Sequence, residues 1–538
     1  MKYPIGIQSF ETLRRDGYVY VDKTDLIFKL AQGHIYFLAR PRRFGKSLLV
    51  STLKAYFEGR KDLFEGLKMM QQEQKWEKYP VLTFDFNGLS PTEDKPLRAY
   101  LMRRLDEAEQ QYGLEHDEAD DVNLRFRTLI PRLHQKTGKR VVVLIDEYDK
   151  PLLDLLETDN AGDEQQQAYN REVLKAFFSI FKATDDHLRF VLLTGITKFS
   201  QVSMFSGFNQ PDDISLSSRY DTLLGITEEE LHTVFAEGIA ELAEAQGMTT
   251  EALKTRLKQH YDGYHFSKRM VDVYNPFSIL NAFANVDIRD FWFASGTPTY
   301  MVRLLNKKPE EVMTFTGRYY PEQMFVDYKA DTEMPLPMFF QSGYLTIKGI
   351  DREFNTYLLD YPNQEVKQGI ITLLANSYLQ SDQPVPSWTE QIVRALRVGD
   401  TDLVRRLFTA FLAETPYTMR PKKTQRQREL YFHYTFYLLM RLISCYTVYT
   451  EKQLSEGRAD CIIETPHYIY VFEFKLDGTA DQALEQIQDC GYAKPYEADP
   501  RPVTCIGASF SSQTGTIEEW EINKNEIKGI RKQKNRTK

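Results

Sequence analysis

The chain has 538 residues, of which 42% are hydrophobic and 27% are charged. This length predicts two to four domains of ordinary size, and the apolar content excludes wholesale disorder, a collagen-like structure and a simple coiled coil. The 68 Lys and Arg residues against 76 Asp and Glu give a net charge of −8. Any attraction to nucleic acid must therefore come from local basic patches.

No apolar run reaches the roughly 18 to 20 residues of a membrane-spanning helix, and the nearest candidate is interrupted by Arg441. The first residues lack the apolar core of a secretory signal. We therefore expect a cytoplasmic protein without a membrane segment. The four cysteines have no metal-ligand spacing, and we interpret them as buried reduced thiols.

Four short apolar runs alternate with helical patterns early in the chain, at residues 34–39, 80–86, 140–146 and 188–195. This alternation is typical of an α/β fold with a parallel sheet covered by helices on both faces. We predict a P-loop domain at 1–225, a helical middle region at 226–416, a second α/β module at 417–523 and a basic tail at 524–538. The acidic segment 106–121 is interpreted as a solvated helix end and loop.

A phosphate-binding pattern follows the first apolar run, in the sequence RPRRFGKS at residues 40–47. In G-x-x-x-x-G-K-[ST] loops, backbone N–H groups and a helix N-terminus face the phosphates, the lysine reaches their oxygens and the hydroxyl holds Mg²⁺. Arg40 stands where the first glycine is expected. A basic turn that caps a helix is the alternative. The predicted nucleotide-binding residues of the loop are Arg43, Phe44, Gly45, Lys46 and Ser47.

Two acids end the apolar run at 141–145, at the sheet edge where α/β folds bind their ligands. We expect Asp146 to hold Mg²⁺ through water, together with Ser47, and Glu147 to orient or deprotonate the attacking water. Thr197 closes the next strand and is a candidate sensor of the γ-phosphate, although a threonine there is more often a cap. The alternative for Asp146 and Glu147 is a pair of surface acids.

A third set of candidate residues lies in the segment 457–475, which contains Asp460, Glu473 and Lys475. Glu473 and Lys475 are two residues apart on a predicted strand and share one face. If Pro466 and His467 close a tight hairpin, Asp460 pairs with Glu473 and the three side chains meet. Paired carboxylates beside a lysine suit Mg²⁺-dependent phosphodiester hydrolysis, whereas an exposed ion pair is the alternative.

These motifs together resemble the bacterial AAA-ATPase-like family that is often fused to a PD-(D/E)XK nuclease-like domain. In that family the arginine-rich loop is ordinary. The motifs that carry the resemblance are YVYVDKT (18–24), RPRRFGKSLL (40–49), LIDEYDKP (144–151), LTGITKFSQVSMFSGFN (193–209), YDGYHF (261–266), VYNPFSIL (273–280), FWFASGTPTYMV (291–302), FQSGYLTIK (340–348) and GRADCIIETPHYIYVFEFK (457–475).

The resemblance implies a P-loop NTPase domain and a restriction-endonuclease-like module at the C-terminus. It implies that Glu429 is a further metal-side acid and that the segment 22–24 lies near the adenine. It also implies that Gln486 and Tyr492 belong to the nuclease site, with Gln488 competing for the first of these places. Five basic residues at 420–428 precede Glu429 and suit contacts to a phosphate backbone, or form a solvated linker.

We therefore predict an ATP-binding protein with P-loop ATPase activity, coupled to a Mg²⁺-dependent nuclease that acts on nucleic acid. The expected catalytic residues are Glu147, Asp460, Glu473 and Lys475. The expected metal ligands are Ser47, Asp146, Glu429, Asp460 and Glu473. One alternative is a nucleotide-dependent switch or sensor whose nuclease-like module only binds nucleic acid or a protein. Another is an N-terminal domain that binds ATP structurally. A homo-oligomer or protein partner could assemble through the helical middle region.

Overall fold

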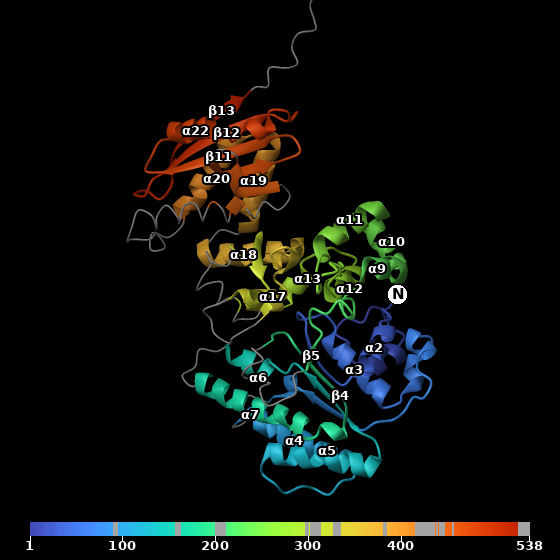
Figure 1. Ribbon diagram of the computed structural model, residues 1–538. Helices are drawn as coiled ribbons and strands as arrows, with labels where there is room; N and C mark the ends of the chain where they lie inside the picture. The colour runs from blue at the N-terminus through green and yellow to red at the C-terminus, as the bar shows by residue number, and fades with distance from the viewer. Residues whose placement is uncertain are drawn as a thin grey trace, which may run out of the picture. The chain divides into compact units, whose positions relative to one another are not determined.

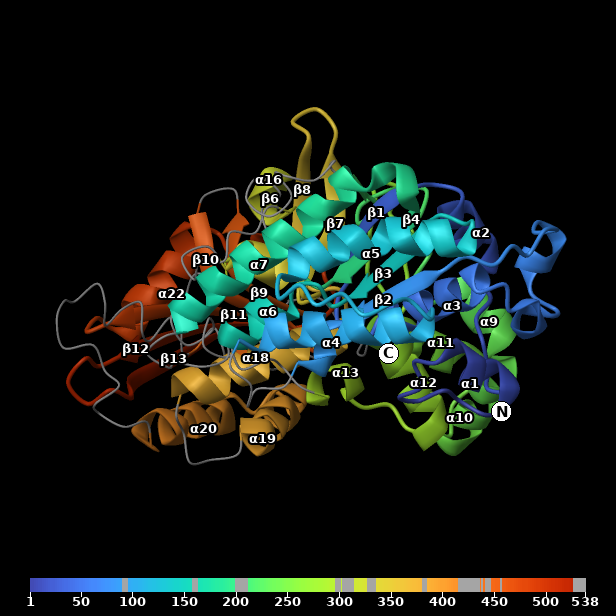
Figure 2. The same cartoon turned by 90° about the horizontal axis from the view of Figure 1, so that it is seen from below.

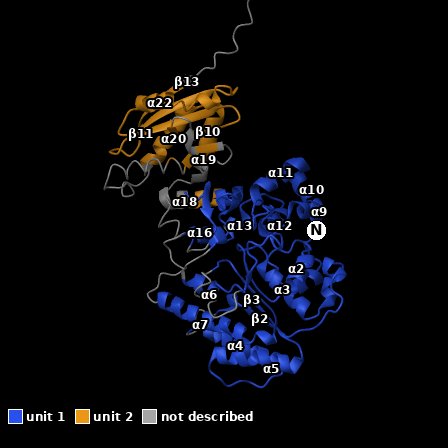
Figure 3. Cartoon of the chain, viewed as in Figure 1, with its two compact units in different colours: residues 1–304, 311–367 blue, residues 305–310, 368–538 orange. Residues whose placement is uncertain are grey.

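The structure is a computed structural model (Figure 1). It describes residues 1–89, 95–156, 163–198, 211–295, 301, 314–326, 335–379, 385–414, 436, 439–440, 447–454 and 457–525. The chain divides into two compact units, one formed by residues 1–304 and 311–367 and the other by residues 305–310 and 368–538 (Figure 3). The middle region 226–416 is thus shared between the two units.

The N-terminal unit is built on a five-stranded sheet in which every neighbouring pair is parallel. The strand order is β2-β3-β4-β1-β5. All six residues of β3 are buried, because a parallel sheet with both faces covered excludes water from its central strands. The predicted parallel α/β fold is confirmed. The strands are β1 (Ile35–Ala39), β2 (Val81–Asp85), β3 (Val141–Asp146), β4 (Leu188–Gly195) and β5 (Asp212–Asp213).

Helices cover both faces of this sheet. Val142 and Leu144 share a core with Leu53 of α3, whereas Phe84 on β2 contacts the rings of Phe126 and Phe177 from α5 and α7. Figure 2 views the sheet from the side of α4, α5 and α7. The helices are α1 (Phe10–Arg15), α2 (Thr24–Ala31), α3 (Lys46–Phe57), α4 (Pro96–Gln111), α5 (Val122–Thr137), α6 (Lys150–Leu153) and α7 (Asp163–Ala183).

The acidic segment 106–121 differs in part from its interpretation as a solvated helix end and loop. Glu109 on α4 is 2% exposed, and one of its carboxylate oxygens lies 2.7 Å from the guanidinium of Arg125 on α5. A buried carboxylate needs such a partner. The partner comes from the neighbouring helix, so the local run of acids did not reveal it.

The rest of the N-terminal unit is mainly helical, as predicted, and also contains an antiparallel sheet of order β6-β8-β7. Its helices pack around Leu231, Phe235 and Leu253, and the N-terminal residue Tyr3 joins this core. The elements are α9 (Glu228–Val234), α10 (Ala236–Ala245), α11 (Thr250–Tyr261), α12 (Pro276–Asn285), α13 (Phe291–Ala294), β6 (Arg318–Pro321), α16 (Gln323–Val326), α17 (Leu336–Gln341), β7 (Thr346–Asp351) and β8 (Thr356–Asp360). Helix α18 (Gln364–Leu379) begins in this unit and continues into the C-terminal unit.

The C-terminal unit contains a five-stranded mixed sheet of order β13-β12-β11-β10-β9. The β10–β11 hairpin pairs Cys461 with Phe472 and Glu464 with Ile469, which confirms the register predicted from the turn at Pro466 and His467. Helices α19 and α20 share a core with one face of the sheet, and α22 packs on the other. The elements are α19 (Val385–Val398), α20 (Thr401–Glu414), β9 (Thr447–Leu454), β10 (Gly457–Glu464), β11 (Ile469–Leu476), α22 (Ala480–Asp489), β12 (Val503–Phe510) and β13 (Ile517–Asn525).

None of the helices within the described ranges is long and apolar enough to cross a membrane. Cys461 and Cys505 are buried in the C-terminal unit, and Cys490 is partly buried. Cys445 lies outside the described residues.

Candidate nucleotide and metal sites

The loop at residues 40–45 joins the carboxyl end of β1 to the first residue of α3, Lys46. Two residues of this loop have left-handed backbone conformations, Arg43 with φ of +66° and Gly45 with φ of +90°. Glycine takes this conformation without cost, whereas arginine is strained in it. Strain held by the surrounding structure is often found at ligand sites. The helix N-terminus that follows is favourable for anions.

Lys46 is nearly buried, with 5% of its surface exposed. Its Nζ donates to the carbonyl oxygens of Arg40 at 3.0 Å and Pro41 at 3.1 Å. Burial lowers the pKa of Lys46, and the negative charge of Glu147 opposes this effect. Among the described residues, the ammonium of Lys46 therefore has only neutral carbonyl oxygens as hydrogen-bond acceptors, and it lies next to a helix N-terminus. A phosphate oxygen at this place would supply it with a negatively charged acceptor.

The loop and the start of α3 line a cavity of about 500 Å³. Two acids from the carboxyl edge of the sheet enter it, Asp85 at the end of β2 and Glu147 after β3. The charged lining residues are Arg42, Arg43, Lys46, Lys150, Asp85 and Glu147. Bases thus outnumber acids by four to two, so the cavity favours an anionic ligand.

The sequence did not single out Asp85, which lies one residue before the end of the apolar run 80–86 and is the last residue of β2. It pairs in register with Asp146 on the neighbouring strand. Its Oδ1 accepts hydrogen bonds from the backbone and side-chain nitrogens of Asn87, both at 3.0 Å. A strand that stops at an acid on the carboxyl edge of a parallel sheet was the available signal.

Burial raises the pKa of Glu147 above its ordinary value, and the positive charge of Lys46 opposes this shift. The backbone of Glu147 is left-handed, with φ of +52°. A carboxylate with a raised pKa is a better general base than an exposed one.

Asp146 and Thr197 lie outside the residues that line the cavity. Asp146 is 3% exposed and accepts a hydrogen bond from the hydroxyl of Thr194 at 2.5 Å. Thr197 is fully buried and donates its hydroxyl to Asp149 at 2.8 Å. The structure therefore does not bring Thr197 to the predicted position of a phosphate sensor.

Asp149 is a buried acid that the sequence reasoning did not single out. Its Oδ2 accepts the backbone N–H groups of Ile196 at 2.9 Å and Thr197 at 2.6 Å, in addition to the hydroxyl of Thr197. Burial raises the pKa of Asp149, and the bonds from Thr197 act against this shift. Asp149 thus fixes the segment after β4 to the segment after β3.

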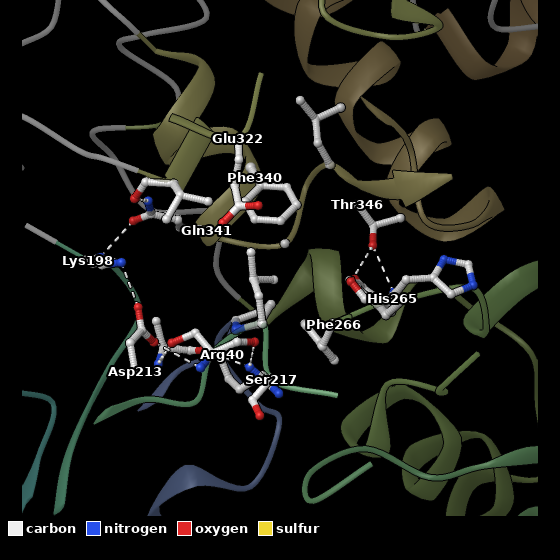
Figure 4. A pocket seen from close by; sticks show the side chains of 18 residues that line it. Arg40, Lys198, Asp213, Ser217, His265, Phe266, Glu322, Phe340, Gln341 and Thr346 are labelled. Atoms are coloured by element: carbon white, nitrogen blue, oxygen red, sulfur yellow. Dashed lines mark hydrogen bonds and ion pairs between the residues drawn. The ribbon is translucent and has the colours of Figure 1, made fainter. Parts of the chain in front are cut away.

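Arg40 points into a second cavity, of about 350 Å³ (Figure 4). Its guanidinium donates to the carbonyl oxygen of Ser215 at 2.5 Å and lies 4.0 Å from the ring centre of Phe266. Burial lowers the pKa of Arg40 to about 9. Among the charged lining residues, Lys198 forms an ion pair with Asp213 at 2.6 Å. Arg40 is thus engaged away from the larger cavity and does not line it.

A small apolar cavity of about 110 Å³ also adjoins the loop and shares Gly45 and Leu48 with the larger cavity. Phe44, Gly45 and Leu48 line it together with Val21 and Leu224. Lys23, from the segment 22–24, also lines this cavity. An apolar slot next to a phosphate loop suits a flat aromatic base.

The C-terminal candidate site lies on the β10–β11 hairpin, where Asp460 and Glu473 contact each other's strand. Asp460 Oδ2 accepts the backbone N–H of Phe474 at 2.8 Å, and Glu473 Oε2 accepts the backbone N–H of Asp460 at 3.4 Å. Lys475 Nζ lies 3.4 Å from Glu473 Oε1. The structure therefore brings together Asp460, Glu473 and Lys475, as the predicted register requires.

Helix α22 adds polar groups to this hairpin. Gln486 accepts a hydrogen bond from Lys475 and donates one to the hydroxyl of Tyr492 at 3.4 Å. Gln488 is exposed instead. Gln486 is thus the glutamine that reaches the lysine.

Glu473 is 2% exposed. Burial and the negative charge of the neighbouring Asp460 raise its pKa to about 7, and Lys475 acts in the opposite direction. Two carboxyl groups that repel each other in a buried place fit a divalent cation, because the cation removes the repulsion and prefers oxygen ligands. Glu429 and the basic residues at 420–428 lie outside the described residues.

Family models match the two parts of the chain that contain the candidate sites. A family model described as a predicted AAA-ATPase matches residues 4–205, and a model of the PD-(D/E)XK nuclease superfamily matches residues 427–520. An uncharacterized protein in the vnfD 5′ region of Azotobacter chroococcum mcd 1 is 35% identical over 522 residues, which is 96% of this chain and 98% of that protein. The chain belongs to this family of AAA-ATPase-like proteins with a PD-(D/E)XK domain.

Solved structures show only distant likeness to this AAA-ATPase-like protein. The ORC2 protein of Aeropyrum pernix, solved as ADPNP–ADP complexes, is 12% identical with a TM-score of 0.28, covering 68% of this chain and 92% of that one. The ORC1 protein of Aeropyrum pernix, solved in complex with DNA, is 9% identical with a TM-score of 0.26, covering 66% and 92%. Similarity at this level supports no conclusion about ligands.

The two family models place the candidate residues in their domains. The AAA-ATPase-like match contains the loop at 40–47 and both Asp146 and Glu147. The PD-(D/E)XK match contains Asp460, Glu473 and Lys475. The family predicted from the motifs is therefore confirmed.

Proposed function

We propose that the AAA-ATPase-like unit binds and hydrolyses ATP with Mg²⁺, and that the PD-(D/E)XK domain cleaves phosphodiester bonds in nucleic acid with a divalent metal ion. Two sites support the proposal. A cavity with excess positive charge lies at the P-loop, and a buried pair of carboxyl groups lies beside a lysine in the C-terminal unit.

The two cavities at the loop suggest how ATP would lie in the N-terminal unit. The base would occupy the apolar slot beside Phe44 and Leu48, and the phosphates would lie over the start of α3. Lys46 would exchange its carbonyl partners for phosphate oxygens, and the hydroxyl of Ser47 lines the same cavity as a metal ligand. Asp146 would act on the metal through water, because it is buried and does not line the cavity.

Glu147 would accept a proton from the attacking water. It lines the cavity, and burial raises its pKa toward the range of an efficient base. Asp85 lies on the same edge of the sheet and can orient this water.

In the PD-(D/E)XK domain, Asp460 and Glu473 would hold the metal ion. The ion supplies a Lewis acid and a water of lowered pKa when it is bound. Lys475, held by Gln486, orients the nucleophile or stabilises charge on the phosphate.

Hydrolysis of ATP by the full-length chain tests the first half. Phosphate release should fall by at least about 100-fold in Glu147→Gln with ATP binding retained, because the base is lost and the phosphate contacts remain. Lys46→Ala should lose binding itself, and Lys54→Ala, a change to an exposed lysine of the same helix, should behave as wild type. Normal turnover in Glu147→Gln would show that its role is wrong.

Cleavage of single- and double-stranded DNA and RNA, with Mg²⁺ or Mn²⁺, tests the second half. Glu473→Gln and Lys475→Ala should each reduce cleavage by at least about 100-fold. Glu464→Gln changes an acid at the other end of the same hairpin and should leave the rate within about twofold. Metal-independent nucleic-acid binding without cleavage would favour the alternative, a nucleotide-dependent switch.

A further inference from the structure

Glu365 is a buried carboxyl group that the proposed chemistry does not use. It is 1% exposed and lies in the first turn of α18. Its Oε2 accepts the hydroxyl of Ser278 at 2.8 Å, and its Oε1 accepts the backbone N–H of Trp292 at 2.6 Å. Glu365 therefore holds α12 and α13 to the beginning of α18.

Helices α12 and α13 both line the cavity of about 500 Å³ at the P-loop. Pro276 and Phe277 of α12 line it, and so does Trp292 of α13. The guanidinium of Arg43 lies 5.1 Å from the ring centre of Phe277. A ligand that changes the position of the P-loop thus acts on α12 and α13, which Glu365 joins to α18.

Trp292 also bonds directly to the P-loop. Its indole Nε1 donates to the carbonyl oxygen of Arg42 at 3.0 Å. Because a peptide group is planar, fixing the carbonyl of Arg42 also fixes the direction of the N–H of Arg43. That N–H is among the donors that a phosphate-binding loop presents to its ligand. Trp292 therefore connects the orientation of a loop amide to Glu365.

Helix α18 continues from one compact unit into the other. It runs from residue 364 to residue 379, and the units divide between Lys367 and Gln368. Ile371 of the same helix packs in the hydrophobic core of the C-terminal unit, so a displacement of the first turn of α18 acts on a helix that is anchored in that core.

We propose that Glu365 and Trp292 link the P-loop to α18, so that nucleotide at the P-loop changes the conformation of α18 and thereby regulates the PD-(D/E)XK site. The link rests on the proposed function, because it needs a nucleotide at the P-loop and a catalytic site in the other domain. Bound phosphate fixes the Arg42–Arg43 peptide, which strengthens the indole bond and holds Trp292 against Glu365. The coupling is reciprocal, so metal and nucleic acid at the C-terminal site alter nucleotide affinity by the same factor.

The test is amide hydrogen exchange of residues 368–379 in the full-length chain, with and without a saturating non-hydrolysable ATP analogue. In the wild type the analogue should slow this exchange by at least about threefold. Trp292→Phe keeps a ring but removes the N–H, and Glu365→Ala removes both acceptors, so each should reduce the effect below about 1.5-fold. Glu365→Gln retains an acceptor and a polar partner for Ser278 and should restore the response.

A matched control separates the link from general loss of packing. Trp388→Phe removes another buried indole bond of 3.0 Å, from Nε1 to the carbonyl of Leu407 in the C-terminal unit, and should keep the response. The analogue should also change the cleavage rate of the wild type, Glu365→Gln and Trp388→Phe. It should have little effect on the cleavage rate of Trp292→Phe and Glu365→Ala.

Binding of the analogue, titrated separately for every variant, distinguishes the two ways to fail. Binding to wild type without a change in α18 would overturn the link and leave the proposed function standing. A normal response in Trp292→Phe or Glu365→Ala would also overturn the link. No binding to wild type would overturn the proposed function, and the link with it.

Discussion

Burial raises the pKa of several acids in this protein. The pKa of Asp262, at the end of α11, is raised to about 7, and that of Glu365 to about 8. Ser278 and the backbone of Trp292 donate hydrogen bonds to Glu365, whereas no side chain among the described residues donates a hydrogen bond to the carboxylate of Asp262. A buried acid without donors favours the neutral form, because water no longer solvates its charge.

The stability of the N-terminal unit should therefore depend on pH through Asp262. Its folded pKa of about 7 exceeds the value of about 3.9 expected in the unfolded chain, so the stabilising contribution is complete below about pH 4 and is lost as the pH rises to about 7. The loss amounts to about 4 kcal/mol at most. Asp262→Asn should flatten the decline in melting temperature between pH 5 and pH 8, and Glu244→Gln, an exposed change, should not. An unchanged decline in Asp262→Asn would contradict this assignment.

A second prediction at the residue scale concerns Gln486. Because Gln486 accepts a hydrogen bond from Lys475, Gln486→Ala should misplace the lysine and lower nuclease activity by about 10-fold. Gln488→Ala, two residues away on the same helix, should leave the rate unchanged. Equal losses in both variants would show that α22 matters only for packing.

At the scale of elements, α22 is fixed on the C-terminal sheet by its cap and by close packing. Thr479 and Gln482 form a capping box, and Glu519 of β13 accepts the backbone N–H of Ala480 at 2.9 Å. A Cβ atom at Gly507 of β12 would lie 2.2 Å from the carbonyl oxygen of Ala480. The glycine thus allows the helix to approach the strand.

Gly507→Ala should displace α22 from the sheet. We expect the C-terminal unit to lose about 1–3 kcal/mol of stability and the nuclease activity to fall, since Gln486 moves with the helix. Chemical denaturation and cleavage assays measure the two effects. Gly349→Ala on β7 is the control, because the nearest atom to its Cβ would be a side-chain atom of Leu358 at 3.3 Å and no backbone atom is among its three nearest neighbours. A fully stable and active Gly507→Ala would contradict the packing argument.

At the scale of the whole molecule, the chain consists of two compact units with separate hydrophobic cores. Multidomain proteins commonly unfold in more than one step. A ligand that binds only the folded state of one unit stabilises that unit by mass action.

Calorimetry of the full chain should therefore show an ATP-dependent transition. ATP with Mg²⁺ at 100 times its dissociation constant should stabilise the N-terminal unit by about 2.7 kcal/mol. Lys46→Ala should remove this shift, and Lys54→Ala should retain it. An ATP shift of wild-type size in Lys46→Ala would place the nucleotide elsewhere.

The sequence by itself determined the features that depend on neighbouring residues. Continuous apolar runs predicted the parallel sheet, Gly-Lys-Ser marked the start of α3, and a short turn set the pairing of Cys461 with Phe472. Local periodicity and turn length carry this information, because each is set by backbone geometry within a few residues.

Only the tertiary structure decided which distant groups meet. The bond from Trp292 to Arg42 spans 250 positions and that from Trp292 to Glu365 spans 73, so no local pattern could reveal them. Thr197 is a further example, because its hydroxyl donates a hydrogen bond to Asp149, which the sequence pattern did not indicate. A motif names the groups available for chemistry, whereas burial and long-range hydrogen bonds decide where each side chain points.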